Sequence, residues 1–188
     1  GDVYKRQIYG KRMMGQGWYT PPRSSFDLET GQGSPYFVYT YSTQMAEVQV
    51  DVKTGAVDVL KLIATFDIGK AINPLMVEGQ IEGGVMMGLG YALMEEVILE
   101  DGMIQNLNLQ DYIIPTALDA PEILPIYIEY PNVHGPFGAK GIGEMPNIPA
   151  APAITNAISN AIGARIYDLP AHSERVYRAI RKRFEKKD

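Results

Sequence analysis

A short glycine-rich segment carries the residue pattern best suited to chemistry. Residues 135–149 read GPFGAKGIGEMPNIP, with four glycines in nine residues and a single carboxylate, Glu144, directly after the last of them. Glycines allow the backbone to come within contact distance of a ligand, and unpaired amide hydrogens at a following helix start could bind an anionic group. A helix start would also favour the ionised form of Glu144, and an ionised carboxylate can act as a base.

The spacing of this segment excludes two common phosphate-binding patterns. It lacks the GxxxxGK[ST] order of a P-loop, and GKGIGE lacks the third glycine of a dinucleotide fingerprint. From the residues alone, a structural acid that merely offsets a helix dipole is the favoured interpretation of Glu144. Spacing by itself therefore does not make Glu144 a catalyst.

Composition narrows the class of protein. The chain has 188 residues, 46% of them hydrophobic, and a net charge of -5, which favours a globular fold and argues against nucleic acid as a partner. It has no cysteine, so any iron–sulfur cluster must lie on another domain or subunit. His134 and His172 have no second ligand at a metal-binding spacing, so we predict no metal held by side chains of this chain.

The ends and the longest apolar run predict a soluble, cytoplasmic protein. Residues 85–94 form the longest apolar run, about half of the roughly 20 residues that a membrane-spanning helix needs, and no leader pattern opens the chain.

The sequence also predicts how the chain is divided. Residues 1–7 resemble a translated sequencing adapter and are predicted to be non-native. Residues 8–34, rich in Gly, Pro, Ser and Thr, predict an extended connection, and residues 35–188 form the remaining domain.

Hydrophobic periodicity and turn residues predict an α+β fold. Mixed or antiparallel strands and hairpins would pack with a glycine-rich helix and two C-terminal helices. Asn73 suits the N-cap of the glycine-rich helix, with Pro74 as its first residue. Ile154, Ile158 and Ile162 form one apolar stripe, and so do Val176, Ile180 and Phe184 in the last helix. The expected strands are residues 36–52, 57–66, 97–99, 104–109 and 123–130, and the expected helices are residues 74–95, 149–162 and 173–184.

The first of these helices contains five glycines. Each glycine inside a helix costs about 0.5–1 kcal/mol relative to alanine, so five of them indicate that something approaches the helix closely. Close packing of the helix within the protein and contact with a ligand both satisfy this requirement. The glycines are Gly79, Gly83, Gly84, Gly88 and Gly90.

Three motifs together resemble one enzyme family. FDIGKAINP (66–74), GQIEGGVMMGLGYALMEE (79–96) and GPFGAKGIGEMPNIPAAPAITNAI (135–158) are similar, in this order, to motifs of the molybdenum hydroxylases. This family includes the xanthine dehydrogenases, aldehyde oxidoreductases and carbon monoxide dehydrogenases. The resemblance implies that the chain is the C-terminal part of their molybdopterin-binding large subunit.

The resemblance also assigns site residues. Glu144 matches the glutamate that stands beside the metal, which implies a general base in the hydroxylation of an aldehyde or an N-heterocycle such as xanthine with oxygen from water. Many relatives carry glutamine where this chain has Met87, which puts one cofactor hydrogen bond in doubt. For Lys140, a solvated loop lysine is an equally weighted alternative. The implied cofactor-binding residues are Lys140, Gly141, Ile142, Gly143, Gly84, Met87 and Gly88.

The implied cofactor is molybdenum-molybdopterin, as such or as its dinucleotide. Iron–sulfur clusters and FAD would lie on other domains or subunits, so we expect a hetero-oligomer that acts on a small molecule, with no membrane or nucleic-acid partner. The fragment by itself is expected to be inactive. Carbon monoxide oxidation, reductive dehydroxylation of a thioester, and a non-catalytic scaffold in which Glu144 is structural remain as alternatives.

Overall fold

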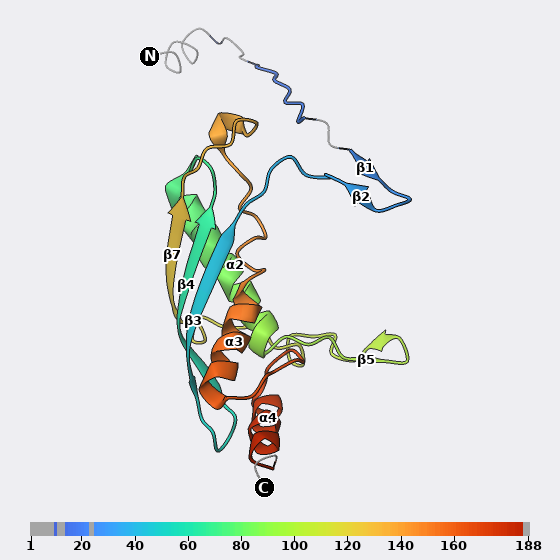
Figure 1. Cartoon of the computed structure of the whole chain (residues 1–188), viewed down its shortest axis with the longest axis vertical. Coiled ribbons are helices and arrows are strands. Elements are labelled where there is room, and N and C mark those ends of the chain that lie inside the picture. Colours follow the sequence, from blue (N-terminus) through green and yellow to red (C-terminus); the bar gives the residue numbers. More distant parts are fainter. Residues whose placement is uncertain (1–9, 11–13, 23–24, 186–188) are drawn as a thin grey trace. The chain divides into compact units, whose positions relative to one another are not determined.

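The computed structural model describes residues 10, 14–22 and 25–185 (Figure 1). The predicted adapter-derived residues 1–7 lie outside the described residues. The chain divides into two compact units, Gly1–Phe37 and Val38–Asp188.

The first unit contains a short hairpin where the sequence predicts only an extended connection. Strands β1 (Phe26–Asp27) and β2 (Gln32–Gly33) pair in antiparallel fashion. The turn between them forms because the Asp27 carboxylate accepts a hydrogen bond from the Glu29 amide at 2.9 Å, while Gly31 adopts a positive φ of 67°. A local side-chain contact therefore organises a segment without hydrophobic periodicity.

A three-stranded sheet forms the centre of the second unit. Strand β3 (Ser42–Val50) pairs antiparallel with β4 (Val57–Asp67), and β4 pairs in parallel with β7 (Glu122–Ile128), in the order β3-β4-β7. The two expected strands are confirmed as this hairpin, and its turn contains Gly55 at a φ of 77°. Between β4 and β7 the chain passes through a helix, which permits the parallel pairing.

Three helices complete this unit and confirm the α+β fold class. They are α2 (Pro74–Leu93), α3 (Ala150–Ile162) and α4 (Ser173–Glu185), besides the short helix η1 (Pro136–Gly138). Alternate residues of β4 (Leu62, Ala64 and Phe66) are fully buried in a core shared with α2 and α3. The alternation of the strand thus selects the face that the helices cover.

The predicted helix signals are largely confirmed. The Asn73 side chain caps α2 by accepting from the Met76 amide at 3.2 Å, and the stripe of Ile154, Ile158 and Ile162 is buried. One expectation is wrong: Phe184 is 61% exposed, because the core ends at Ile180.

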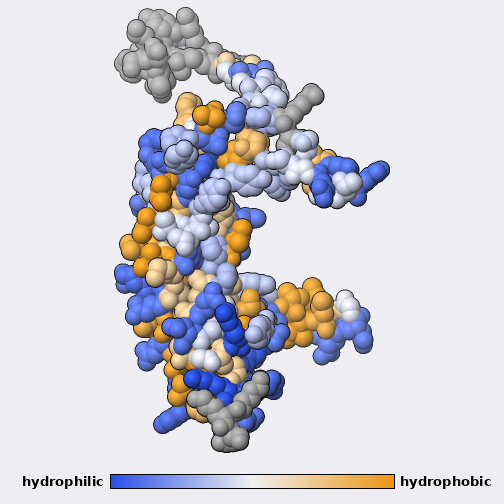
Figure 2. All heavy atoms as spheres, in the orientation of Figure 1, coloured by the Kyte–Doolittle hydropathy of each residue, from blue (hydrophilic) through white to orange (hydrophobic). Residues whose placement is uncertain are grey.

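The hairpin between α2 and β7 is shorter than predicted. Strands β5 (Leu99–Glu100) and β6 (Met103–Ile104) have two residues each and flank a turn at Asp101 and Gly102. Apolar side chains are exposed on this hairpin and beside β7, as Figure 2 shows. In the described part of the chain, no helix has the length and apolar character needed to cross a membrane.

Candidate functional site

The glycine-rich segment is tied to the end of strand β4 by backbone hydrogen bonds. The Lys140 amide donates to the Ile68 carbonyl at 2.8 Å, and the Lys70 amide donates to the Gly138 carbonyl at 2.9 Å. The close approach requires Gly69, where an added methyl group would collide with the Gly138 carbonyl oxygen, and Gly138 itself has a φ of 86° that side-chain-bearing residues rarely adopt. The first half of the segment is therefore attached to the end of the sheet by backbone hydrogen bonds and is not a free loop.

Lys140 forms a buried ion pair with Asp67. The two charged groups lie 2.5 Å apart, and their side chains are only 5% and 14% exposed. The ammonium also donates to the Tyr39 carbonyl and lies 5.7 Å from the centre of the Tyr130 ring. The alternative of a solvated loop lysine is wrong, and any contact of Lys140 with a cofactor stays a prediction.

The ion pair changes the acidity of Asp67. Burial alone would raise its pKa, but the hydrogen bond from Lys140, the hydrogen bond from the Gly69 amide and the Lys140 charge outweigh burial. The pKa of Asp67 therefore lies below its ordinary value of 3.8. Asp67 serves as a fixed anionic anchor for the segment that carries Glu144.

Glu144 lies in a bend that is followed by turns, ahead of the helix that the sequence predicts from residue 149. Helix α3 begins at Ala150, and the Glu144 carbonyl accepts a turn hydrogen bond from the Asn147 amide at 3.2 Å. The side chain is exposed and, within the described residues, has no hydrogen bond or ion pair.

One face of α2 holds the segment around Glu144. Gln80 Nε2 donates to the Gly143 carbonyl at 2.7 Å. A methyl group added to Gly84 would lie 2.7 Å from Pro146, and one added to Gly88 would lie 2.8 Å from the Asn147 carbonyl oxygen. We call Gly84 and Gly88 the closed glycines, because the chain itself fills the space beside them.

Other glycines in the same motifs face open space. Apart from the adjoining residues and the backbone of the same helix, a methyl group added at any of these positions would meet no atom of the described chain within 4 Å. None of them has a positive φ, so nothing in the backbone conformation requires glycine there. We call them the open glycines; they are Gly79, Gly83, Gly141 and Gly143.

A run of backbone donors accompanies the open glycines. Within the described part of the chain, the amide N–H groups of residues 141–145 have no hydrogen-bond acceptor. Backbone N–H groups are obligatory donors, and five consecutive free ones can bind the oxygen atoms of an anionic group. These amides are therefore available to an anionic ligand.

A cavity of about 310 Å³ adjoins this segment. It lies between the first half of α2 and residues 139–143, and Ile72, Met76 and Ile142 supply apolar walls. Gly143 also lines it, so the Glu144 backbone stands at the margin of a concave surface. Met87, in the second half of α2, is 64% exposed and does not line this cavity.

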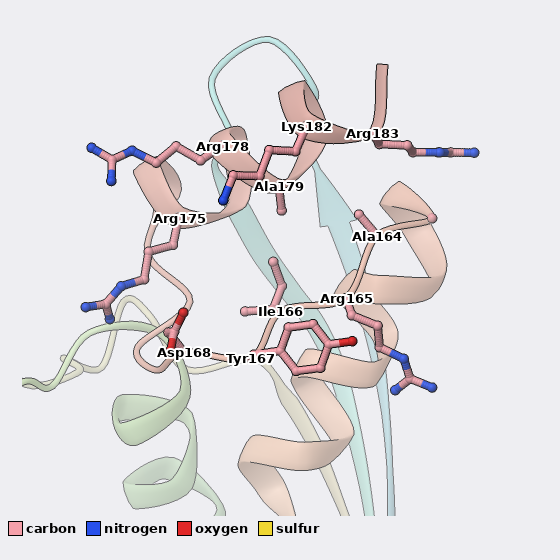
Figure 3. Close-up of a pocket in the computed structure, with 11 residues that line it drawn as sticks. Ala164, Arg165, Ile166, Tyr167, Asp168, Arg175, Arg178, Ala179, Lys182 and Arg183 are labelled. Atoms are coloured by element: carbon pink, nitrogen blue, oxygen red, sulfur yellow. The ribbon is translucent and has the colours of Figure 1, made fainter. Parts of the chain in front are cut away.

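A larger cavity of about 600 Å³ lies elsewhere, between residues 163–168 and helix α4 (Figure 3). Five basic side chains line it, yet the guanidinium groups of Arg165, Arg178 and Arg183 point away from its centre. Four of the five basic groups already have partners: Arg165 with Asn156, Arg175 with Glu96, Arg178 with Glu174, and Arg183 with the Ile162 carbonyl. Size alone therefore does not mark this cavity as the functional site.

Sequence reasoning missed the residues that position the segment. No sequence pattern assigns a site role to Asp67, Gln44 or Gln80. The i, i+4, i+8 spacing of Gln80, Gly84 and Gly88 places them on one helical face and was a signal that could have indicated their common contact. No local pattern connects Gln44 to this segment.

The fold and this site define a class of protein. It is an α+β domain in which open glycines and free backbone amides lie on a glycine-rich helix and on the segment packed against it. The family model of the molybdopterin cofactor-binding domain matches residues 2–121. The chain is 41% identical over 165 residues to the aldehyde oxidoreductase of Megalodesulfovibrio gigas, covering 87% of this chain and 18% of that protein. It is 36% identical over 152 residues to the xanthine dehydrogenase molybdenum-binding subunit of Escherichia coli O157:H7, covering 80% and 20%.

Solved structures agree with these relatives. The aldehyde oxidoreductase from Desulfovibrio desulfuricans superposes with a TM-score of 0.80 at 40% identity, covering 94% of this chain and 19% of that one. The chain thus belongs to the molybdopterin cofactor-binding domain family of the molybdenum hydroxylases. It spans about a fifth of the length of the relatives it matches.

Proposed function

We propose that residues 35–188 of this chain form the C-terminal portion of the catalytic subunit of a molybdenum hydroxylase. In this proposal Glu144 is the general base. One observation carries the proposal: an unpaired, exposed carboxylate stands on a firmly held backbone directly beside free amide donors. A carboxylate with no partner inside the chain is available to a reactant outside it. Its exposure fits a chain that spans only a fifth of its relatives.

The residues present fit an anionic molybdopterin. The open glycines leave space for a cofactor to approach the backbone, and the amides of residues 141–145 supply donors. Gly141, Ile142 and Gly143 would hold the cofactor on this side, and Met87 would offer it an apolar contact. When bound, the molybdenum centre supplies two-electron redox chemistry.

The proposed reaction inserts oxygen from water into a carbon–hydrogen bond. Overall, R–H and H₂O give R–OH, two protons and two electrons. Glu144 accepts one proton at a carboxylate oxygen, and general bases typically contribute about 10²–10⁴-fold to a rate. Iron–sulfur and flavin groups on partner domains or subunits would take up the electrons, and this cysteine-free chain has no thiolates to hold an iron–sulfur cluster.

The substrate class we propose is an aldehyde or an N-heterocycle. The named relatives include an aldehyde oxidoreductase, a xanthine dehydrogenase subunit and a nicotine 6-hydroxylase large subunit. A carbon monoxide dehydrogenase large chain from Hydrogenophaga pseudoflava, 31% identical over 176 residues, keeps carbon monoxide oxidation as the second candidate.

The compartment we propose is the cytoplasm. The absence of cysteine suits a reducing compartment of this kind.

The test is Glu144→Gln in the full-length enzyme, which keeps the shape of the side chain and removes its basicity. We expect the rate of substrate oxidation to fall about 10²–10⁴-fold with molybdenum content unchanged. Glu47→Gln, on an exposed position of β3, is the matched control and should leave the rate unaltered. Near-normal turnover of the Glu144 variant with full metal content would favour the scaffold alternative.

A further inference from the structure

Successive turns of α2 contact successive parts of the segment around Glu144. Residues 80, 84 and 88 lie on one helical face because they are four apart. Gln80 bonds the carbonyl of Gly143, Gly84 contacts Pro146, and Gly88 contacts Asn147 and Ala150. The residues on both sides of Glu144 are thus aligned along a single rigid helix.

A second glutamine holds the same segment from the sheet. Gln44 of β3 donates from Nε2 to the Pro146 carbonyl at 2.8 Å, and Pro146 is fully buried. Gln44 Oε1 is buried and, among the described residues, has no partner. Gln44 therefore makes its polar contact through the bond to Pro146 alone.

We propose that Gln80 and Gln44 are positioning residues for Glu144. Each amide binds a backbone carbonyl, one directly before Glu144 and one two residues after it, while the carboxylate itself stays free. The two contacts fix the direction in which this carboxylate leaves the backbone. The inference rests on the proposed function, because a fixed direction matters only if Glu144 acts on a reactant.

The two glutamines are suited to this role for a physical reason. Residues 144–149 form turns whose internal hydrogen bonds join residues three apart, so they do not set the orientation of the segment against α2. Misplacement of a reacting group by about 1 Å can cost about 10²-fold in rate. The Gln80–Gly143 bond is exposed and adds little to overall stability, so for Gln80 the rate should respond more strongly than folding. The Gln44–Pro146 bond is partly buried, so its loss should also lower stability to some extent.

The test uses the full-length enzyme with Gln80→Met and Gln44→Met, which keep side-chain length and remove the donor. We expect kcat to fall about five- to tenfold in each variant, with KM within twofold and molybdenum content unchanged. Hydrogen–deuterium exchange at the Asn147 and Ile148 amides, the hydrogen-bonded amides of residues 143–149, should become about five- to tenfold faster, with helix α3 unaltered. Gln49→Met, at an exposed position of β3 away from the segment, is the matched control and should change neither quantity.

A double variant separates positioning from independent effects. In the Glu144→Gln background, Gln80→Met should cause no further loss of rate, because there is no base left to position. If the rate losses of Gln80→Met and Glu144→Gln are fully additive, or if exchange in residues 143–149 is unchanged, the positioning role is wrong. The proposed function still stands in that case if Glu144→Gln alone abolishes turnover.

The opposite failure is also distinct. If Glu144→Gln retains near-normal turnover, the proposed function falls, and the positioning role falls with it. The exchange measurement then still reports whether the two amides hold the segment.

Discussion

The closed and the open glycines are the same residue type in the same motifs, yet the chain explains only one set. Gly84 and Gly88 face Pro146, Asn147 and Ala150, where any side chain would collide. The open glycines of α2 and of the 141–143 turn face nothing in the described chain. On the closed side glycine serves internal packing, and on the open side it leaves room for something outside the chain.

The difference between the two sides explains how one segment can be both rigid and available. Its core-facing side is fixed by the Lys140–Asp67 ion pair and by the face of α2. Its other side keeps free amides and an unpaired carboxylate. A preorganised site needs both a fixed backbone and free polar groups, because groups already hydrogen-bonded within the chain are not free to bind or react.

The largest stability effect should come from Lys140→Met on the closed side. It leaves the Asp67 carboxylate buried without its cation, and loss of one partner of a buried pair costs about 3–5 kcal/mol in the free energy of unfolding. Urea unfolding of the chain measures this. Lys61→Met is the matched control, since the Lys61–Glu122 pair is more exposed and should contribute at most about 1 kcal/mol. Equal losses in both variants would show that the segment is not anchored by Lys140.

The second effect is predicted for Gly88→Ala. The added methyl group would collide with Ala150 and with the Asn147 carbonyl, and overpacking of this kind costs about 1–3 kcal/mol. A lowered midpoint of urea unfolding would confirm it. A stability equal to that of the unmodified chain would mean that the 146–150 segment can move away from α2 without cost.

Gly83→Ala should act in the opposite direction. Alanine raises helix propensity, so the chain should gain about 0.5–1 kcal/mol of stability, because no described atom lies near the added methyl group. In the full-length enzyme the same change should reduce molybdopterin content if the open side contacts the cofactor. Unchanged cofactor content would show that Gly83 lies outside the cofactor site.

The finest test of the closed side is a pH dependence. The pKa of Asp67 is lower in the folded chain than its ordinary value of 3.8, so Asp67 contributes stability that is fully present above that value. This stability is lost as pH falls through the folded-state pKa. The difference in unfolding free energy between Lys140→Met and the unmodified chain should therefore shrink at acid pH. A constant difference from pH 7 to pH 3 would contradict the assigned ion pair.

Local interactions explain which parts of the fold could be predicted. The Asn73 cap, the Gly55 turn and the stripe of Ile154, Ile158 and Ile162 depend on residues within four positions of one another. The main strands and helices could be predicted for the same reason. The β1–β2 hairpin was not predicted, because its turn is formed by one carboxylate and its strands show no hydrophobic periodicity. The parallel pairing of β4 with β7 was not assigned, since pairing across a helical crossover leaves no local pattern.

By itself the sequence determined the α+β class, the glycine content of α2 and the presence of a single acid after GAKGIG. Tertiary structure alone decided which glycines are closed and that Lys140 pairs with Asp67, 73 residues away. It also decided that Gln80 and Gln44 reach Gly143 and Pro146 across 63 and 102 residues. Such contacts depend on how separate elements pack, and no pattern of neighbouring residues encodes that packing.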